Sequence, residues 1–362
     1  MKSPVVFLVP ILIPFAWAYG WLMRLRVWCY DMGVLPSYSC GAFVVSIGNL
    51  QVGGTGKTPI SAFFANRWKD KVRLGIVSRG YGRSSSGVLR VDPNVENAAA
   101  KFGDEPTLLA AITKQPVQVG LSRVQAARDL VMSEGIRLVL MDDGLQHLKL
   151  RRSFDFLLFD VTAPKWHWRL IPWGRMREPW SALFRADAVI LTKTESVSAE
   201  HLMETQKLIR GKLDSLGRRQ VPIIRMKQQI AFDFSQDASS DKAAFLVAGI
   251  ARPEIFFGMV RRLSSDVRVV GEKDFVDHHN YSKEDVGEIV ALARAAKATS
   301  VATTEKDAVK LLPLWRNYQQ TLPLVVSELS VHPVDATDEK ELERIDAGIF
   351  DQLRGLSGRA AR

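Results

Sequence analysis

A glycine-rich segment between a short apolar run and a helical pattern constrains this chain more than any other feature. The run Val44–Ile47 predicts a buried strand, and it is followed by Gln51-Val52-Gly53-Gly54-Thr55-Gly56-Lys57-Thr58, with Pro59 near the first helical position. Glycines let backbone N–H groups turn toward a bound phosphate, and the helix N-terminus adds a favourable dipole. We therefore expect this segment to bind the phosphates of a nucleotide, with Lys57 at the β- and γ-phosphates and the Thr58 hydroxyl on Mg²⁺.

The segment departs from the strict phosphate-loop pattern at one position, because Gln51 stands where that pattern has its first glycine. A flexible loop without a ligand is the alternative. The apolar run Leu138–Met141, which leads into Asp142-Asp143, favours the nucleotide site, because carboxylates at the C-terminal end of a parallel strand can hold Mg²⁺ or its waters. Alone, these two acids would be interpreted as a solvated turn; together with Lys57 they favour a metal site.

Short apolar runs alternate with longer amphipathic stretches after Pro36, which predicts an α/β fold with a mainly parallel sheet and helices on both faces. The expected strands of the first half are Ala42–Ile47, Val72–Ser78, Val117–Gly120, Leu138–Met141, Phe156–Asp160 and Ala188–Thr192. The expected helices between them are Pro59–Lys69, Glu105–Thr113 and Arg123–Glu134. We expect a hydrophobic segment over 1–35, a phosphate-loop domain over 36–217, a hinge or linker over 218–243 and a smaller α/β domain over 244–362.

The N-terminal segment Val5–Met23 is almost entirely apolar and, as a helix, would extend about 28 Å, which just reaches across a bilayer. Tryptophan and tyrosine crowd its C-terminal end, and Arg24 and Arg26 follow, as at the headgroup level of a membrane. A cleaved signal peptide and a buried core helix are the alternatives. Whether the segment spans the bilayer or lies in one leaflet stays open.

The charge of the chain suits a polyanionic partner without choosing one. Lys and Arg total 49 against 39 Asp and Glu, a formal net charge of +10, which fits nucleic acid, an anionic membrane or a phosphorylated substrate. The two cysteines, Cys29 and Cys40, form no metal-type cluster, and we expect reduced thiols.

Several separate motifs, in the same order along the chain, resemble the tetraacyldisaccharide 4′-kinase (lipid A 4′-kinase) family. The resemblance covers roughly 42–310 together with the apolar N-terminus, and in that family Gln51 is no departure. The motifs are Val45-Ser46-Ile47-Gly48-Asn49-Leu50 before the phosphate loop, Ser78-Arg79-Gly80-Tyr81-Gly82, Gly103-Asp104-Glu105-Pro106, Met141-Asp142-Asp143-Gly144-Leu145-Gln146-His147, Met176-Arg177-Glu178-Pro179, Phe275-Val276-Asp277-His278-His279 and Thr304-Glu305-Lys306-Asp307.

The resemblance implies an enzyme of lipopolysaccharide assembly that transfers the γ-phosphate of ATP, with Mg²⁺, to the 4′-hydroxyl of an acylated glucosamine disaccharide 1-phosphate. It implies two α/β/α lobes, a main lobe of the phosphate-loop NTPase type and a smaller C-terminal one, joined by a strand-containing hinge with the nucleotide between them. It also implies attachment to the cytoplasmic face of the bacterial inner membrane through the N-terminal segment. We expect the lipid substrate and an anionic membrane surface as partners, and neither nucleic acid nor an obligate protein partner.

The same resemblance assigns the acceptor chemistry to an acid and a histidine. Asp104 would be the general base for the sugar hydroxyl, and His278 would orient or tune it. From the sequence alone Asp104 is better explained as a helix N-cap, and a turn histidine is commonly a surface residue. The neighbouring His279 is an alternative to His278.

Further roles follow for residues near the strand ends. Lys57 and Arg177 would neutralise the transferred phosphoryl group, and Glu178 would join Thr58, Asp142 and Asp143 at the magnesium. Arg177 and Glu178 could equally be an exposed ion pair of little energetic value. Arg79 and Tyr81 would meet the substrate, as would Arg177.

Two other functions remain compatible with the residues. One is a different phosphate-loop small-molecule kinase or ligase, which would be soluble. The other is a switch or partitioning ATPase with protein or nucleic-acid partners, for which Thr192-Lys193-Thr194-Glu195 could serve as a base-recognition loop.

Overall fold

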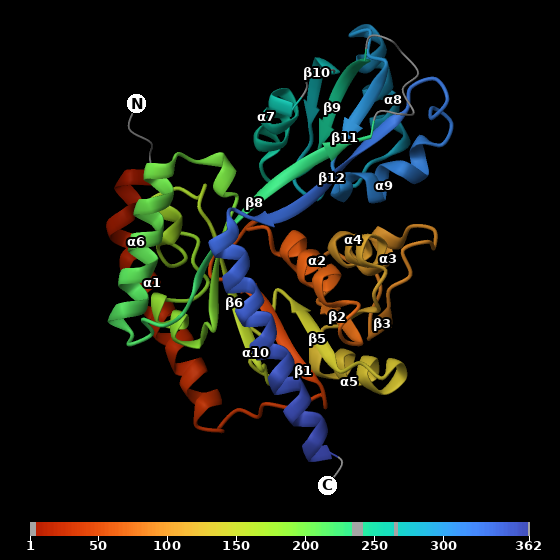
Figure 1. Cartoon of the computed structure of the whole chain (residues 1–362). Helices are drawn as coiled ribbons and strands as arrows, with labels where there is room; N and C mark the ends of the chain where they lie inside the picture. Colours follow the sequence, from red (N-terminus) through yellow and green to blue (C-terminus); the bar gives the residue numbers. More distant parts are fainter. Residues whose placement is uncertain (1–4, 234–241, 264–266, 361–362) are drawn as a thin grey trace. The chain divides into compact units, whose positions relative to one another are not determined.

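The computed structural model describes residues 5–233, 242–263 and 267–360, which form two compact units (Figure 1). The first unit combines Met1–Arg79, Gly120–Gln228 and Val331–Arg362, and the second combines Gly80–Val119 with Gln229–Ser330. These units differ from the expected boundaries, because 80–119 groups with the second half of the chain and 331–362 with the first. Packing between elements that are distant in sequence decides this grouping, so it cannot be predicted from patterns of neighbouring residues.

The first unit is built on a parallel sheet with strands in the order β8-β7-β6-β1-β5-β2. The strands are β1 (Phe43–Asn49), β2 (Leu74–Ser78), β5 (Leu138–Asp142), β6 (Phe154–Asp160), β7 (Ala188–Thr192) and β8 (Ile223–Phe232). Every residue of β1, β2, β5 and β7 is buried, as expected for strands covered on both faces. The predicted alternation of strands and helices is therefore confirmed as a mixed α/β fold rich in parallel pairing.

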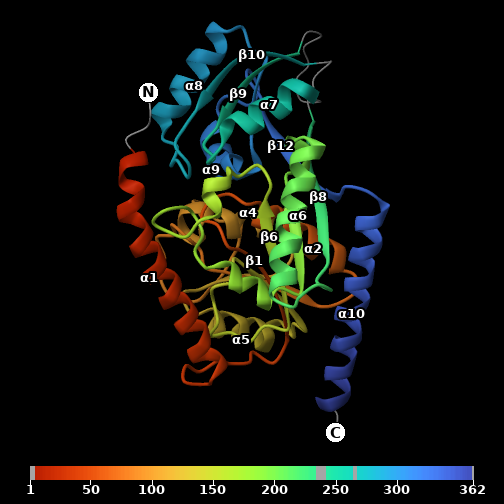
Figure 2. The ribbon, with the colours of Figure 1, turned by 90° about the vertical axis from the view of Figure 1, so that its left-hand side faces the viewer.

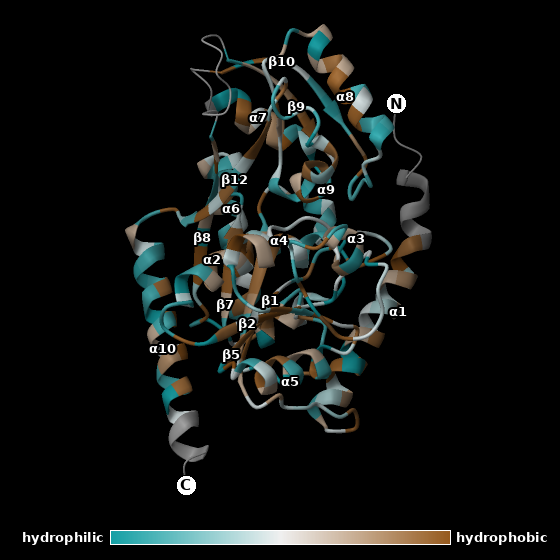
Figure 3. Cartoon of the chain, turned by 90° about the vertical axis from the view of Figure 1, so that its right-hand side faces the viewer, coloured by the Kyte–Doolittle hydropathy of each residue, from teal (hydrophilic) through white to brown (hydrophobic). Residues whose placement is uncertain are grey.

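Helices surround this sheet. They are α1 (Val5–Asp31), α2 (Lys57–Trp68), α5 (Arg123–Glu134), α6 (Ala199–Ser215) and α10 (Ala336–Ala360), with short 3₁₀ helices η1 (Lys165–Trp168), η2 (Trp180–Arg185) and η3 (Thr194–Ser196). Figure 2 shows α1 and α10 on opposite sides of the first unit. In Figure 3 the strands β1, β2 and β5 are largely brown, whereas α5 and α10 alternate between brown and teal, as helices with one buried face do.

The second unit carries its own parallel strands in the order β10-β9-β11-β12. These are β9 (Lys242–Ala248), β10 (Val267–Asp274), β11 (Ser300–Thr303) and β12 (Leu324–Pro333), and the short antiparallel pair β3 (Leu89–Arg90) and β4 (Val117–Val119) belongs to the same unit. Its helices are α3 (Ala98–Phe102), α4 (Asp104–Thr113), α7 (Pro253–Leu263), α8 (Lys283–Ala295) and α9 (Glu305–Trp315). The predicted linker contains β8, and part of it, residues 234–241, lies outside the described residues.

The N-terminal helix α1 has two different faces. Ala16 is buried, Tyr19 donates a hydrogen bond to the carbonyl of Arg177 at 2.7 Å, and a Cβ on Gly20 would come within 2.7 Å of Leu170, so this face packs closely on the first unit. The other face exposes Trp17 (71%) and Trp21 (60%), among other apolar side chains. Within the described ranges, none of the helices combines the length and the apolar character that a bilayer crossing requires.

A buried carboxylate joins α10 to the helix that follows the phosphate loop. Asp346 of α10 accepts from Arg67 Nε at 2.6 Å and from Trp68 Nε1 at 2.7 Å, so both of its oxygens are used. Arg67 also contacts Glu339 at 2.7 Å. These bonds hold the C-terminal turn of α2 against α10.

Replacing Asp346 with alanine is expected to lower the free energy of unfolding by about 3 kcal/mol, because it leaves a largely buried guanidinium and a buried indole N–H without their acceptor. Denaturant unfolding measures the change. The matched control is Glu343→Ala on the exposed side of α10, with an expected change within about 0.5 kcal/mol. Equal effects of the two substitutions would contradict a stabilising role for the Asp346 network.

Candidate active site

The phosphate loop joins the end of β1 to the start of α2 and has the backbone shape that glycine permits. Gly53 and Gly56 have φ angles of 119° and 84°, in the region that other residues avoid. Asn49, the last residue of β1, donates from Nδ2 to the carbonyl of Gln51 and to Thr55 Oγ1, both at 2.6 Å. The sequence-predicted strand, loop and helix are thus present in this order, with Lys57 as the first residue of α2.

A second layer of side chains holds this loop from the end of β7. Lys193 Nζ donates to the carbonyl of Gly54 at 2.6 Å and to Asp160 Oδ2 at 2.7 Å, and its side chain is buried. Thr192 Oγ1 donates to the carbonyl of Thr55 at 2.9 Å. The Thr192–Glu195 segment, which the sequence could only connect with base recognition, therefore supports the loop backbone.

The two acids predicted for the metal lie beside the loop because of strand register. Ile47 of β1 pairs with Asp142 of β5, so the carboxyl ends of these strands lie side by side. Asp142 is 1% exposed and accepts from Ser61 Oγ of α2 at 2.9 Å. Asp143 Oδ1 lies 3.7 Å from Lys57 Nζ and 2.9 Å from Arg177 Nη2.

The ionisation of Asp143 follows from these contacts. Burial alone would raise its pKa, but the positive charges of Lys57 and Arg177 outweigh burial and lower the pKa to about 2. Asp143 is therefore a carboxylate at any physiological pH. Arg177 also contacts Asn49 Oδ1, so three motifs that are distant in sequence meet at Lys57.

The oxygen ligands fit a magnesium ion that is bound mainly through a nucleotide. Thr58, Asp142 and Asp143 offer hydroxyl and carboxylate oxygens, and Mg²⁺ in phosphoryl-transfer sites commonly needs only one or two carboxylates beside phosphates and waters. No group of three or more His, Cys, Asp or Glu residues that could hold a metal by itself occurs in the described part of the chain. Glu178, the remaining predicted ligand, is 2% exposed and pairs with Arg185 at 2.7 Å, so the structure places it in an ion pair.

A group of basic and amide side chains that the sequence reasoning did not single out lies around Arg177. Arg123, the first residue of α5, is 8% exposed, and Gln146 Nε2 donates to the carbonyl of Asn49 at 3.1 Å. Arg26 of α1 donates to the carbonyl of Gln146 at 2.9 Å. Gln146 and His147 belong to the Asp-Asp-Gly-Leu-Gln-His motif, which could have indicated them as site residues. No motif in the sequence around Arg123 indicates that it belongs to the site.

This group is short of negative charge. Burial lowers the pKa of the Arg123 guanidinium, Asp143 partly opposes the shift, and Arg79 and Arg177 add to it. Burial, together with Arg123, Arg152 and Lys149, lowers the pKa of His147 to about 4. Among the described residues, Arg123 Nε, Arg177 Nε and His147 Nε2 are buried without a hydrogen-bond partner. The two unpaired guanidinium N–H donors and the clustered positive charges suit an anionic ligand.

The second unit contains the predicted acid and histidine in direct contact. Asp104 Oδ2 lies 3.2 Å from His278 Nδ1 and 2.9 Å from Lys310 Nζ. Gly103, with φ 97°, occupies the N-cap position of α4, and Asp104 is already the first helical residue. The side chain of Asp104 therefore makes tertiary contacts, and the N-cap interpretation is wrong.

The structure shows which of the two adjacent histidines contacts Asp104. His279 Nε2 lies 3.0 Å from Asp285 and its ring stacks on Phe275, whereas His278 contacts Asp104. Burial alone would raise the pKa of Asp104, but the hydrogen bonds from His278 and Lys310 outweigh burial and lower it. The catalytic roles of the pair stay a prediction.

Two further motifs lie in the same region of the second unit. Tyr81 is 68% exposed, and its ring lies edge-on to that of His278 with centroids 6.0 Å apart. Lys306 contacts both Asp277 and His278. Asp307 is fully buried and accepts from Gly249 N, Thr304 Oγ1 and Tyr281 Oη, which makes it a structural residue of the second unit.

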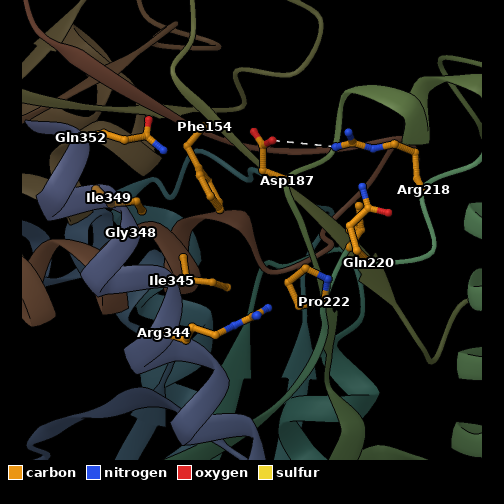
Figure 4. Close-up of a pocket in the computed structure, with 11 residues that line it drawn as sticks. Phe154, Asp187, Arg218, Gln220, Pro222, Arg344, Ile345, Gly348, Ile349 and Gln352 are labelled. Atoms are coloured by element: carbon orange, nitrogen blue, oxygen red, sulfur yellow. Dashed lines mark ion pairs between the residues drawn. The ribbon is translucent and has the colours of Figure 1, made fainter.

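A cavity of about 400 Å³ in the first unit lies away from all of these residues. It is next to Phe154 at the start of β6 and Asp187 just before β7, the opposite ends of the strands from the phosphate loop, and α10 forms one wall (Figure 4). Its one marked ion pair joins Asp187 and Arg218 at 3.8 Å. The cavity contains none of the sequence-predicted site residues.

The chain was also compared with known proteins. A family model described as tetraacyldisaccharide-1-P 4′-kinase matches residues 8–346. The chain is 29% identical to the tetraacyldisaccharide 4′-kinase of Cytophaga hutchinsonii, over 97% of this chain and 99% of that protein. It is 34% identical to the enzyme of the same name from Bdellovibrio bacteriovorus, over 84% of this chain and 90% of that protein.

Among solved structures, the "apo" form of LpxK from Aquifex aeolicus in complex with ATP is similar over the full fold. The TM-score is 0.71 at 26% identity, and the match covers 95% of this chain and 99% of that one. The match of the family model across most of the chain and the full-length relatives lead to one conclusion: the chain belongs to the tetraacyldisaccharide 4′-kinase family.

Proposed function

We propose that this protein transfers the γ-phosphate of ATP to the 4′-hydroxyl of a tetraacyldisaccharide 1-phosphate, giving the bisphosphorylated lipid A precursor. The observation that carries the proposal is the phosphate loop with Lys57, Asp143 and Arg177 gathered beside it, in a chain that matches this kinase family from residue 8 to residue 346. The relative from Aquifex aeolicus, whose structure is described with ATP, supports ATP as the phosphoryl donor.

In this proposal residues 51–58 hold the triphosphate through backbone N–H groups. Lys57 neutralises the charge that develops on the transferred group, and Arg177 assists it. Thr58, Asp142 and Asp143 are the proposed ligands of Mg²⁺, which would screen the phosphate charges and orient them. Glu178 stays a candidate further ligand: its Oε2 pairs with Arg185, whereas its buried Oε1 has no hydrogen-bond partner among the described residues.

The Asp104–His278 pair of the second unit accepts the proton of the sugar hydroxyl. A sugar alcohol has a pKa far above 7, so its attack on phosphorus benefits from a positioned acceptor. Asp104 is the proposed base, and His278 orients it through the contact between Nδ1 and Oδ2. The strand-containing connection through β8 stays part of the proposal.

The phosphate that the acceptor already carries needs an anion site. The unpaired Nε–H donors of Arg123 and Arg177 support such a site in the first unit, and Arg79 adds positive charge to it. We include Arg79 and Tyr81 among the residues that bind the acceptor.

The acyl chains of the acceptor stay in a bilayer, so the proposal includes attachment of α1 to the cytoplasmic face of the inner membrane. Tryptophans at one face of a helix, with arginines nearby, are typical of segments at the membrane interface.

Replacing Trp17, Trp21 and Trp28 together with serine is expected to reduce binding to anionic phospholipid vesicles about tenfold or more, because three exposed interfacial side chains are lost. Vesicle flotation measures the bound fraction. Met132→Ser, which removes an apolar side chain that is 85% exposed outside α1, is the matched control and should bind like the unchanged protein. If the triple variant binds vesicles as well as the unchanged protein does, α1 is not the membrane contact.

The activity is tested with the full chain in detergent micelles, γ-labelled ATP, Mg²⁺ and the disaccharide 1-phosphate lipid. Label on the lipid, absent when the 4′-hydroxyl is blocked, is the expected result. Label released only as inorganic phosphate, and stimulated by DNA or a protein partner, would instead indicate a switch or partitioning ATPase. Transfer to a soluble small molecule in preference to the lipid would indicate another kinase or ligase.

A further inference from the structure

Helix α9 presents two lysines, one helical turn apart, to the acid and the histidine of the second unit. Lys310 Nζ lies 2.9 Å from Asp104 Oδ2, and both side chains are nearly buried, at 8% and 13% exposure. Lys306 Nζ lies 3.2 Å from His278 Nε2 and 3.1 Å from Asp277 Oδ1. Residues four apart on a helix lie on one face, so α9 brings both ammonium groups to the pair at once.

The contacts of Asp104 fall on only one of its oxygens. His278 Nδ1 and Lys310 Nζ both approach Oδ2, and among the described residues no donor reaches Oδ1. A carboxylate with one oxygen held by two donors cannot rotate freely. Oδ1 is therefore the atom that can take a hydrogen bond from a substrate hydroxyl.

The contacts of His278 decide which of its nitrogens carries the proton. An ammonium group has donors and no acceptor, so Nε2 facing Lys306 must accept a hydrogen bond. In the neutral ring the proton is then on Nδ1, where it is donated to Asp104 Oδ2. Lys306 is held in turn by Asp277, the residue before His278.

We propose that Lys306 and Lys310 are positioning residues for the proton acceptor: Lys310 fixes Asp104 with Oδ1 open, and Lys306 fixes His278 as its Nδ1–H tautomer. Only the expected effect of the two lysines on the transfer rate rests on the proposed function. The tautomer and the carboxylate geometry can be measured without any turnover.

A change in pH dependence follows for Lys310. The ionisable groups that face the pair are Lys306 and Lys310 of α9, Asp277 and Tyr281 of the loop after β10, and Tyr81 of the segment after β2. Burial raises the pKa of Asp104, whereas His278 and Lys310 lower it. Removing the Lys310 charge leaves burial less opposed, so the pKa of Asp104 rises and the acid limb of the rate profile moves to higher pH, by about one unit or more.

The first experiment is ¹⁵N NMR of the histidine rings in the full chain, which has six histidines, with the His278 signals assigned by their loss in His278→Gln. The unchanged protein is expected to give the Nδ1–H tautomer, and Lys306→Met a mixture with substantial Nε2–H. Lys306→Arg should keep the original tautomer. An unchanged His278 spectrum in Lys306→Met would overturn the role of Lys306.

The second experiment measures kcat and KM for ATP against pH. Lys310→Met is expected to lower kcat at neutral pH about tenfold with KM for ATP unchanged, and to shift the acid limb upward, whereas Lys310→Arg restores most of both. Lys283→Met, an exposed lysine of the same unit, is the control and should leave the profile unchanged. Circular dichroism shows whether each variant folds, and ¹³C NMR of the Asp104 carboxyl follows its titration directly.

The outcomes separate the two proposals. A carboxyl titration of Asp104 that is the same in Lys310→Met and in the unchanged protein overturns the role of Lys310, whatever the activity. Full activity of Asp104→Asn would instead overturn the proposed base, while the NMR results on the two lysines would stand.

Discussion

Lys57→Met is expected to lower kcat for phosphoryl transfer by about 10³-fold or more. The ammonium group belongs to the first residue of α2, in the loop proposed to bind the triphosphate, and electrostatic stabilisation is the main catalytic contribution in phosphoryl transfer. Its contacts with Asn49 and Asp143 hold it in place. The measurement is single-turnover transfer of labelled phosphate to the lipid.

The control for this substitution is Lys69→Met, an exposed lysine at the other end of α2 that should leave the rate within twofold. Circular dichroism and thermal unfolding establish that the Lys57 variant is folded. A folded variant with near-normal transfer would refute the phosphate-loop assignment, and with it the proposed donor site.

Asp104→Asn is expected to lower kcat by about 10²–10⁴-fold while the affinity for ATP stays the same. The amide keeps the size of the side chain but cannot accept a proton, and it is in the second unit, whereas the phosphate loop is in the first. Equilibrium binding of a fluorescent ATP analogue and the kcat of transfer are measured on the same preparation.

The loss of the carboxylate also leaves Lys310 without its partner, so stability must be measured beside activity. Glu105→Gln, the next residue on α4, makes the same chemical change without a described contact to His278 or Lys310 and should retain activity. Parallel losses of ATP binding, stability and kcat in Asp104→Asn would indicate a structural ion pair and would remove Asp104 as the base.

Particular residues show which parts of the candidate site could be predicted from local sequence patterns. The phosphate loop, its strand and its helix were predictable, because glycine backbone freedom, β-branched residues and a lysine at a helix start act within a few residues of one another. The acids after β5 were predictable for the same reason. Lys310 was not, because it lies 206 residues from Asp104 and nothing around it in the sequence distinguishes it from a surface lysine. Arg123, which is buried at the start of α5, was not predicted as a site residue for the same reason.

Asp104 is the residue for which local and tertiary information disagree. Next to Glu105-Pro106 it has the sequence of an N-cap, yet Gly103 takes that position, and two donors from residues 278 and 310 bind its carboxylate. Likewise, the sequence could not separate His278 from His279, because adjacent residues share one local pattern. The fold separates them by directing one ring to Asp104 and the other to Asp285.

The sequence by itself determined the alternation of strands and helices, the phosphate loop and the family to which the chain belongs, since each of these depends on short motifs whose residues are close together along the chain. Only the tertiary structure decided that 80–119 joins the second unit, that Glu178 pairs with Arg185, and that two lysines of α9 hold the acid and the histidine. The physical reason is that burial and charge pairing depend on which side chains meet in space, and residues more than a hundred positions apart meet only when the chain has folded.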